Sequence, residues 1–316
     1  MKTFILSLLA AAALPLAAQA DDAWPERPVQ VVIPGSAGGD TDFNAREMAK
    51  FFEQITGTPM AVTNMPGGGG TIATNEVRQA RPDGSTVLFA HVGQYIVTEV
   101  SGLQDFSWDT FEVCCVAAVD KGAVFVASPK FKSLDQLVAQ LKEDPGSVTY
   151  GTEFGGYSHL QGLIFSDLAG VEMKMVDTGT ASEKLAALLG GRIDLAAITY
   201  GVAADYAKSG LLTILAQPNA ERSPLIPDVP TFAEQGVDFV LDKPYMFGFP
   251  PGTDPAIVAR MDEIVKQITE NPDYAEDLRK GYNQPVSYLG HDATQEMMTG
   301  LRGKLMAYLD DLRAAR

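Results

Sequence analysis

Hydrophobic positions along the chain follow two alternating patterns. Short apolar runs, typical of buried strands, fall at 29–33, 60–63, 86–90, 124–127, 148–150, 195–198, 212–216 and 245–249. Longer amphipathic segments, which favour helices, fall at 42–56, 71–80, 134–142, 158–168, 182–189, 256–269, 273–280 and 294–314. Strands that alternate with helices predict an α/β fold with mostly parallel sheets flanked by helices.

The first twenty residues form a separate pattern. Lys2 precedes an apolar stretch at 4–18, and Ala18-Gln19-Ala20 has the small-x-small form of a cleavage site. This order is typical of a secretory signal peptide, here residues 1–20. The apolar stretch is shorter than the roughly 20 residues that a membrane span needs. We therefore expect a soluble mature chain exported to the periplasm.

Length and charge limit the remaining possibilities. A chain of 316 residues with 46% hydrophobic composition is long enough for about two domains. Proline-containing breaks at 123–129 and 216–218 are candidate hinges, which predicts a first lobe at 21–124, a second at 125–225 and a return to the first at 226–316. The net charge of −16 disfavours nucleic acid and anionic lipid as partners. It does not exclude a small anion held by local backbone dipoles.

The two cysteines are adjacent, at Cys114 and Cys115. Neighbouring residues in a strand point to opposite faces, so a bridge between them would require local distortion. We expect two buried thiols rather than a redox site.

Glycine-rich loops precede three expected helices. The first, PGSAGGDTDFNAR at 34–46, has Asp40, Thr41 or Asp42 as a candidate helix cap. The second, GTEFGGYSH at 151–159, is followed by a possible Ser158/Gln161 capping box, and the third helix starts with a capping box at 180–183. Free N–H groups at helix starts bind anions, so helix starts from two lobes that face one cleft would hold a carboxylate.

Signals for catalysis are weak. Gly68, Gly70 and Ala73 fit a dinucleotide-binding pattern, but the acidic residue expected after the next strand is missing, so the run is interpreted as a loop at the cleft edge. Motifs of serine hydrolases, zinc proteases and phosphate-binding loops are absent from the sequence. The three histidines lack zinc-binding spacing, and His91 at a strand end is the best candidate for a site residue. No catalytic residue, metal or cofactor is expected.

Several longer motifs carry a family resemblance. WPERPVQVVIPGSAGGDTDFNAR, NMPGGGGTIATNEVRQARPDGSTVLFA, LAALLGGRIDLA and RSPLIPDVPTFAEQG are similar to conserved-looking blocks of the Bug receptors, the periplasmic substrate-binding proteins of tripartite tricarboxylate transporters. The resemblance covers essentially the whole mature chain. It implies a two-lobed, type II-like Venus flytrap that binds a small carboxylate between its lobes, works with inner-membrane permease subunits and is a monomer.

Ligand contacts follow from the resemblance and from the loops together. The family holds one ligand carboxylate near the segment that corresponds to the first glycine-rich loop. This implies a role here for Ser36, Ala37, Gly38, Gly39 and Asp40. With the other loops, the expected ligand-binding residues are Ser36, Ala37, Gly38, Gly39, Asp40, Thr41, Gly69, His91, Thr152, Glu153, Tyr157, Ser158, Asp177, Thr178, Thr180 and Tyr200.

Three segments depart from the family pattern and are expected to set ligand choice: 153–157, 177–180 and 243–245. Glu153 or Asp177 in the cleft would favour a ligand with a hydroxyl or ammonium group at one end. A plain tricarboxylate would be repelled unless those carboxylates point away from the cleft. Two alternative functions remain at this point: a receptor that signals to a membrane sensor kinase, and a secreted enzyme that uses the same cleft.

Overall fold

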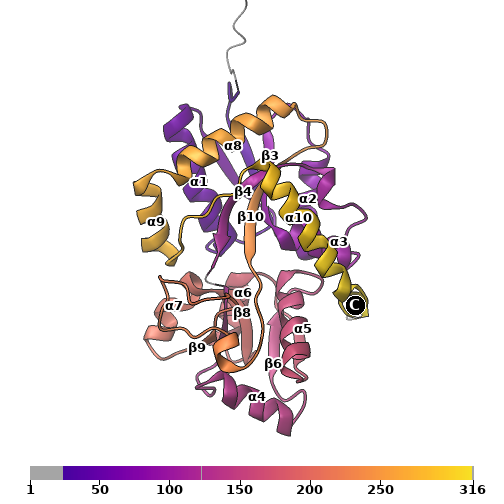
Figure 1. The fold of residues 1–316 in the computed structure, drawn as a ribbon, viewed down its shortest axis with the longest axis vertical. Coiled ribbons are helices and arrows are strands. Elements are labelled where there is room, and N and C mark those ends of the chain that lie inside the picture. Colours follow the sequence, from indigo (N-terminus) through magenta and orange to yellow (C-terminus); the bar gives the residue numbers. More distant parts are fainter. Residues whose placement is uncertain (1–23, 122, 315–316) are drawn as a thin grey trace, which may run out of the picture.

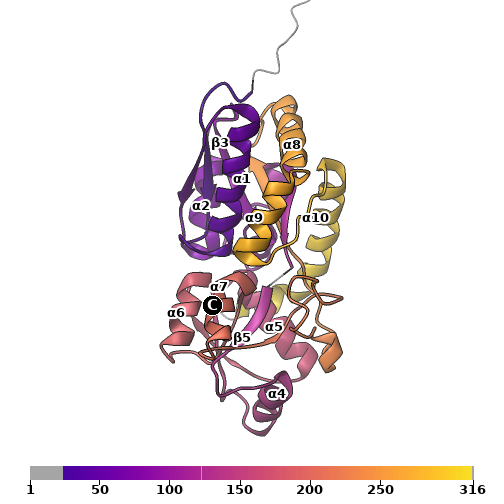
Figure 2. The same cartoon turned by 90° about the vertical axis from the view of Figure 1, so that its left-hand side faces the viewer.

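Two five-stranded sheets, each flanked by helices, lie one above the other along the long axis of the molecule (Figure 1 and Figure 2). The computed structural model describes residues 24–121 and 123–314, so the expected signal peptide lies outside the described residues. The expected two-lobed α/β architecture is confirmed, but the sheets are mixed rather than mostly parallel. We call the part built on the sheet that contains β1 (Val29–Ile33) the first lobe and the other part the second lobe.

The first sheet has the strand order β2-β1-β3-β10-β4. Its other strands are β2 (Met60–Asn64), β3 (Thr86–His91), β10 (Lys243–Phe249) and β4 (Glu112–Asp120). The pairs among β2, β1 and β3 are parallel, whereas β10 is antiparallel to both β3 and β4. The sheet is mixed because β10 enters it from the second lobe and runs against its neighbours.

The second sheet repeats this plan with the order β7-β6-β8-β5-β9. Its strands are β7 (Lys174–Asp177), β6 (Thr149–Thr152), β8 (Leu195–Thr199), β5 (Ala123–Ala127) and β9 (Thr213–Ala216). Pairing is parallel among β7, β6 and β8 and antiparallel where β5 meets β8 and β9.

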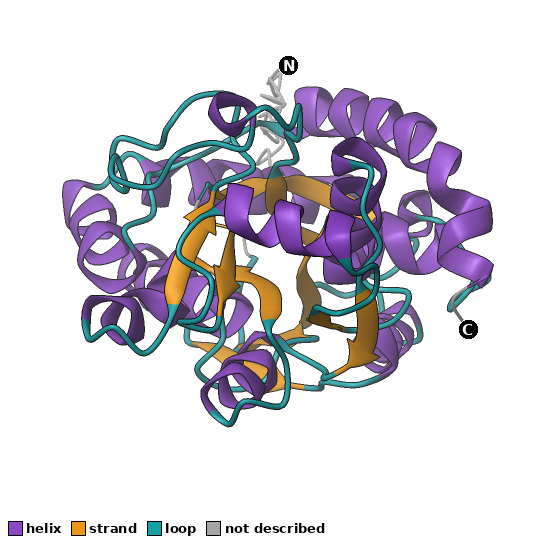
Figure 3. Ribbon diagram, turned by 90° about the horizontal axis from the view of Figure 1, so that it is seen from below, coloured by secondary structure: helices purple, strands orange, loops and turns teal. Residues whose placement is uncertain are grey.

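Helices cover both faces of the strands (Figure 3). Those of the first lobe are α1 (Asp40–Thr56), α2 (Thr71–Arg78), α3 (Thr98–Val100), α8 (Pro255–Thr269), α9 (Pro272–Tyr282), α10 (His291–Leu305) and α11 (Leu309–Ala314). Those of the second lobe are α4 (Leu134–Glu143), α5 (Tyr157–Ala169), α6 (Ala181–Leu189) and α7 (Tyr200–Lys208). A π-helical turn, Gly93–Val97, follows β3 directly.

The chain passes between the sheets from β4 to β5 and again from β9 to β10. The two passages lie side by side, because Lys243 at the start of β10 is paired with Asp120 at the end of β4. The return comes later than the expected residue 226, since Phe232 and Phe239 still pack on Phe125 of the second sheet, with ring centroids 4.9 and 6.1 Å away.

The strands β4 and β7, the helices α3 and α7 and the π-helical turn after β3 were not expected from the sequence. β4 reads as one long alanine- and cysteine-containing apolar run, which periodicity cannot assign to a strand or a helix. The last expected helix, 294–314, consists of α10, a 3-10 turn at Met306–Tyr308 and α11. None of the helices within 24–314 is long and apolar enough to cross a membrane.

Candidate functional site

Three helices begin at one cavity between the lobes, α1 from the first lobe and α5 and α6 from the second. The cavity has a volume of about 60 Å³. Its lining residues are Pro34, Gly35, Ser36, Gly39, Asp40, Thr41, His91, Gln94, Glu153, Tyr157, Ser158, Gln161, Thr180, Ala181, Lys184, Ala197, Ile198 and Lys243. Helix starts from both lobes therefore meet in one place, as the glycine-rich loops predicted.

An aspartate side chain stabilises the turn of the first glycine-rich loop but does not cap the helix that follows it. Gly39 is the N-cap of α1, and Gly38 adopts φ +75°, which favours glycine. The Asp42 carboxylate accepts a hydrogen bond from the Gly38 N–H at 3.0 Å and also binds Arg46. The expectation that Asp40, Thr41 or Asp42 caps the helix is therefore wrong. Asp42 instead fixes the tight turn that brings the first N–H groups of α1 to the cavity.

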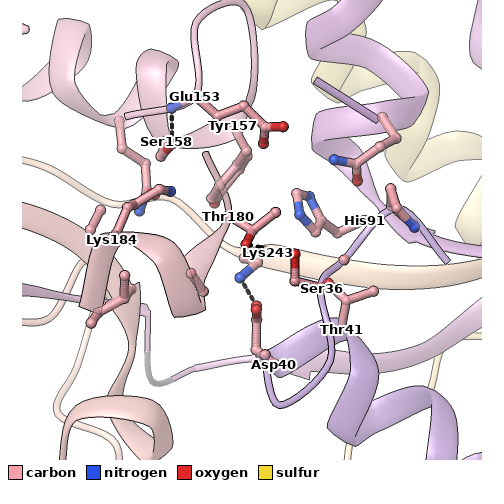
Figure 4. Close-up of a pocket in the computed structure, with 18 residues that line it drawn as sticks. Ser36, Asp40, Thr41, His91, Glu153, Tyr157, Ser158, Thr180, Lys184 and Lys243 are labelled. Carbon is pink, nitrogen blue, oxygen red and sulfur yellow. Dashed lines mark hydrogen bonds and ion pairs between the residues drawn. The ribbon is translucent and has the colours of Figure 1, made fainter. Parts of the chain in front are cut away.

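Buried charges join the two lobes at the floor of the cavity. Lys243 forms an ion pair with Asp40 (Figure 4). It forms a second one, at 3.3 Å, with Asp120, and the Tyr245 hydroxyl donates to Asp40. Thr199 of the second sheet donates to Asp120. Burial alone would raise the pKa of Asp40, but Lys243 and Tyr245 outweigh it and hold that pKa well below its usual range. Asp40 is therefore an anion at neutral pH and neutralises Lys243.

A second buried lysine comes from α6. Lys184 is only 6% exposed, and its ammonium makes no hydrogen bond or ion pair with any residue in the described ranges. Burial lowers its pKa to about 8, an effect that Glu153 partly opposes. Lys184 is thus mostly protonated at neutral pH, and it is a buried cation without a direct partner. Such a group is costly unless something else pairs with it.

Glu153 is positioned by the loop before α5. Its N–H donates to Ser158 Oγ at 3.1 Å, and that hydroxyl lies 3.1 Å from Thr152 Oγ1. Burial raises the pKa of the Glu153 carboxyl, while Lys184 and a hydrogen bond from the Gly69 backbone oppose the shift. The Ser158/Gln161 capping box is not formed, because the N-cap of α5 is Gly156 and Ser158 binds the loop instead.

His91 is neutral in this site. Burial and, after it, Lys243 lower its pKa to about 3. Its Nδ1 accepts the Gly93 N–H at 3.0 Å, so the ring proton is on Nε2, where it is available as a donor. The His91 ring packs in a T-shaped arrangement against the rings of Tyr157 and Tyr245, with ring centroids 5.3 and 5.4 Å away.

The sixteen residues expected to bind ligand fall into four groups. Those that line the cavity are Ser36, Gly39, Asp40, Thr41, His91, Glu153, Tyr157, Ser158 and Thr180. Gly69 and Asp177 line a neighbouring groove together with Glu153 and Thr180. Thr152 and Thr178 do not line the cavity, and the Thr178 hydroxyl donates to the Thr152 carbonyl. The remaining three, Ala37, Gly38 and Tyr200, do not line the cavity. In the first glycine-rich loop, Ala37 and Gly38 are exposed to solvent.

Four polar lining residues were missed as contacts by the sequence reasoning: Gln94, Gln161, Lys184 and Lys243. Gln161 was read as a capping residue and Lys243 only as a departure from a family pattern. Lys184 lies three residues after Ala181, so it belongs to the first turns of the helix that the Thr180 cap predicts. Its position beside a correctly predicted helix start was the available signal.

Ser158 and His159 do not form a catalytic pair in the structure. Ser158 Oγ binds the Glu153 N–H and Thr152, whereas His159 Nδ1 accepts the Gly155 N–H at 3.2 Å. His159 is fully buried and is not among the lining residues. The cavity instead combines helix starts, two lysines and hydrogen-bonding side chains, which is the chemistry of anion binding.

Comparisons with known proteins agree with this geometry. A family model described as "Tripartite tricarboxylate transporter family receptor" matches residues 44–299. A Cupriavidus necator protein, described as "UPF0065 protein in gbd 5'region", is 33% identical over 284 residues, which cover 88% of this chain and 85% of that protein.

Two solved structures share the fold. The periplasmic binding protein BugD has a TM-score of 0.83 and 25% identity, with 92% of this chain and 98% of that chain covered. MatC from Rhodopseudomonas palustris, solved with bound malate, has a TM-score of 0.79 and 25% identity, with 92% and 100% covered. Because the family model spans most of the sequence and the fold agrees, the chain belongs to the tripartite tricarboxylate transporter family of receptors.

Proposed function

We propose that this protein is a periplasmic receptor that captures a small organic carboxylate between its lobes and delivers it to the permease subunits of a tripartite tricarboxylate transporter. The observation that carries the proposal is Lys184, a buried cation that faces the interlobe cavity and has no direct partner among residues 24–121 and 123–314. A ligand carboxylate would supply the missing anion.

The surrounding backbone supports the same ligand class. The first-turn N–H groups of α1 and α6 have no partner inside their helices, and both starts line the cavity. Each start carries a partial positive charge from the helix dipole. MatC, which has the same fold, was solved with bound malate, a small organic acid that carries a hydroxyl group.

Capture involves closure of the lobes about the two chain passages. Contacts that span the cleft are present beside the cavity: Thr180 donates to Ser36 at 3.0 Å, and Ser182 donates to the Ala37 carbonyl at 3.4 Å. A ligand that binds groups on both lobes favours the closed arrangement in proportion to its extra affinity for it. The closed form is then the one presented to the permease.

Export fits this role. Residues 1–20 act as a signal peptide cleaved after Ala20, and the mature protein works as a monomer in the periplasm. Determination of the N-terminus and mass of the exported protein tests cleavage. Ligand uptake in strains with and without the permease separates transport from signalling. Loss of uptake without the permease supports transport, whereas unchanged uptake supports a receptor that signals to a sensor kinase.

The binding test is thermal unfolding of residues 21–316 after unfolding and refolding to remove carried-over ligand. The panel includes mono-, di- and tricarboxylates and amino acids. A bound acid at a hundredfold excess over Kd should stabilise the protein by about 2.7 kcal/mol. Lys184→Met should abolish the shift, whereas Lys174→Met, at an exposed lysine of the same lobe, should retain it. If no acid shifts the unfolding temperature, the proposed function is rejected.

A further inference from the structure

Two glutamines in the cavity have polar atoms that no residue of the described chain satisfies. They are Gln94 Oε1, on the π-helical turn after β3, and Gln161 Nε2, on α5. Both side chains are almost completely buried. Buried polar atoms are nearly always hydrogen-bonded, so an unsatisfied pair that lines a ligand cavity indicates what the ligand provides. One atom is a donor that needs an acceptor, and the other is an acceptor that needs a donor.

The acceptor end of the cavity is built on the loop that contains Gly69. Gln94 Nε2 donates to the Gly69 carbonyl at 3.4 Å, which leaves Gln94 Oε1 as the free atom. The Gly69 backbone also hydrogen-bonds to Glu153, so the two side chains are tied to the same residue. Gln94 Oε1 and the Glu153 carboxylate both accept hydrogen bonds, and a ligand hydroxyl or ammonium would satisfy them.

The donor end is supplied by the second lobe. Lys184 on α6 and Gln161 on α5 both line the cavity, and both lack partners there among the described residues. An ammonium and an amide N–H₂ have no acceptor capacity at those atoms, so together they call for a carboxylate. The N-terminus of α6, at Thr180 and Ala181, adds donors of the same sign.

Charge balance limits the ligand to one carboxylate. Two anions, Asp40 and Asp120, already face Lys243, which leaves Lys184 as the one described lining cation available to a ligand carboxylate and Glu153 as the remaining lining acid. A monocarboxylate takes Lys184 as its counter-charge. A second ligand carboxylate would face the Glu153 and Gln94 oxygens, where it would be buried against acceptors and a like charge.

Size points the same way. The cavity volume of about 60 Å³ is far below the 300–1,000 Å³ typical of sites for larger ligands. Since roughly 10–15 Å³ is the least that admits a single water molecule, a cavity of this size favours a short ligand.

We propose that the cleft selects a short monocarboxylate that carries a hydroxyl or ammonium group beside its carboxyl carbon. Its carboxylate is bound by Lys184 and Gln161, and its donor group by Glu153 and Gln94. This inference rests on the proposed receptor function and specifies its ligand class.

The test compares acids of matched size by calorimetric titration of stripped protein. Lactate and alanine carry the donor, propionate lacks it, and malonate and succinate replace it with a second carboxylate. Lactate or alanine should bind at least about tenfold more tightly than propionate, because loss of one buried hydrogen bond to a charged group is of that size. Both dicarboxylates should bind more weakly than the favoured acid.

Variants separate the two ends and the two donor groups. Glu153→Gln removes the charge but keeps the shape, so it should weaken alanine binding much more than lactate binding. Gln94→Met should bring the favoured acid down to the affinity of propionate, with Lys174→Met as the exposed control. Tighter binding of succinate or malonate than of lactate and alanine would overturn the inference while the receptor function stands. Binding of no acid at all would overturn both.

Discussion

At the scale of single residues, Lys184 determines the electrostatic character of the cleft. Four charged side chains line the cavity, and Asp40 and Lys243 neutralise each other directly. Lys184 is close enough to Glu153 to feel its charge, yet it forms no ion pair with it in the described structure. A buried cation held this way lowers the stability of the unliganded protein and raises its affinity for an anion.

The lowered pKa of Lys184 predicts a specific pH dependence. The folded pKa of about 8 lies below the ordinary value of 10.5, so between these pH values the unfolded chain binds more protons than the folded protein. The unliganded protein should therefore gain stability as the pH rises from 8 to 10.5, by on the order of 3 kcal/mol. Below pH 8 the cost of the buried charge is fully present.

Urea unfolding of wild type and Lys184→Met across this pH range measures the effect. The variant should be the more stable protein at pH 7, and the difference should shrink toward pH 10.5. Other groups that titrate in this window cancel in the comparison. A stability difference that does not change with pH would show that Lys184 is not charged and buried in the folded protein.

At the scale of secondary-structure elements, an irregularity in β4 determines how its two cysteines are arranged. The pairing of β10 with β4 shifts between Met246 and Gly248, where β4 contributes one residue more than its partner. Such a bulge breaks the alternation of side chains. Cys114 Sγ and Cys115 Sγ consequently lie 3.0 Å apart, so the expectation of opposite faces is wrong here.

Both thiols are buried, and burial raises the pKa of each. Because the thiolate is the reactive form, folded protein should resist iodoacetamide. The same protein unfolded in urea without reductant should take up two alkyl groups, as read by intact mass. Cys114→Ser is the matched control and should take up one. No uptake in the unfolded state, with a mass lower by two hydrogens, would mean that the bulge instead holds a disulfide.

At the scale of the whole molecule, closure of the lobes depends on a small residue that does not line the cavity. Gly201 in α7 of the second lobe lies against Tyr282 of α9 in the first lobe. A methyl group added at Gly201 would lie 2.4 Å from a ring carbon of Tyr282. Neither residue lines the cavity, so this contact controls how closely the lobes approach without taking part in binding.

Gly201→Ala should therefore weaken ligand binding by holding the lobes apart. Alanine is the better helix former, so the fold itself should be unaffected. We expect a loss of roughly tenfold in affinity, the equivalent of 1.4 kcal/mol taken from closure. Gly300→Ala in α10, where an added methyl group meets nothing within 4 Å, is the control. Small-angle scattering should show that saturating ligand compacts the control more than Gly201→Ala; equal compaction and affinity would contradict the prediction.

The sequence alone determined the parts of this protein that depend on local chemistry. Apolar runs and helical periodicity place most strands and helices, and the turn of glycines before α1 and the Thr180 cap of α6 place two of the helix starts that meet at the cavity. These features are local because backbone conformation and capping involve residues only a few positions apart. The family could be read in the same way, since its motifs are continuous in sequence.

Only the tertiary structure decided which side chains the cleft contains. Lysine is normally exposed, so the helix start beside Lys184 indicates a place near the cavity but not burial, and no residue close to Lys243 indicates its burial either. The approach of the two lobes buries Lys184, and the return of β10 to the first sheet brings Lys243 to Asp40 across 203 positions. The direction of β10, the bulge at the cysteines and the unsatisfied glutamines likewise depend on partners distant in the chain, and short-range patterns carry no information about such partners.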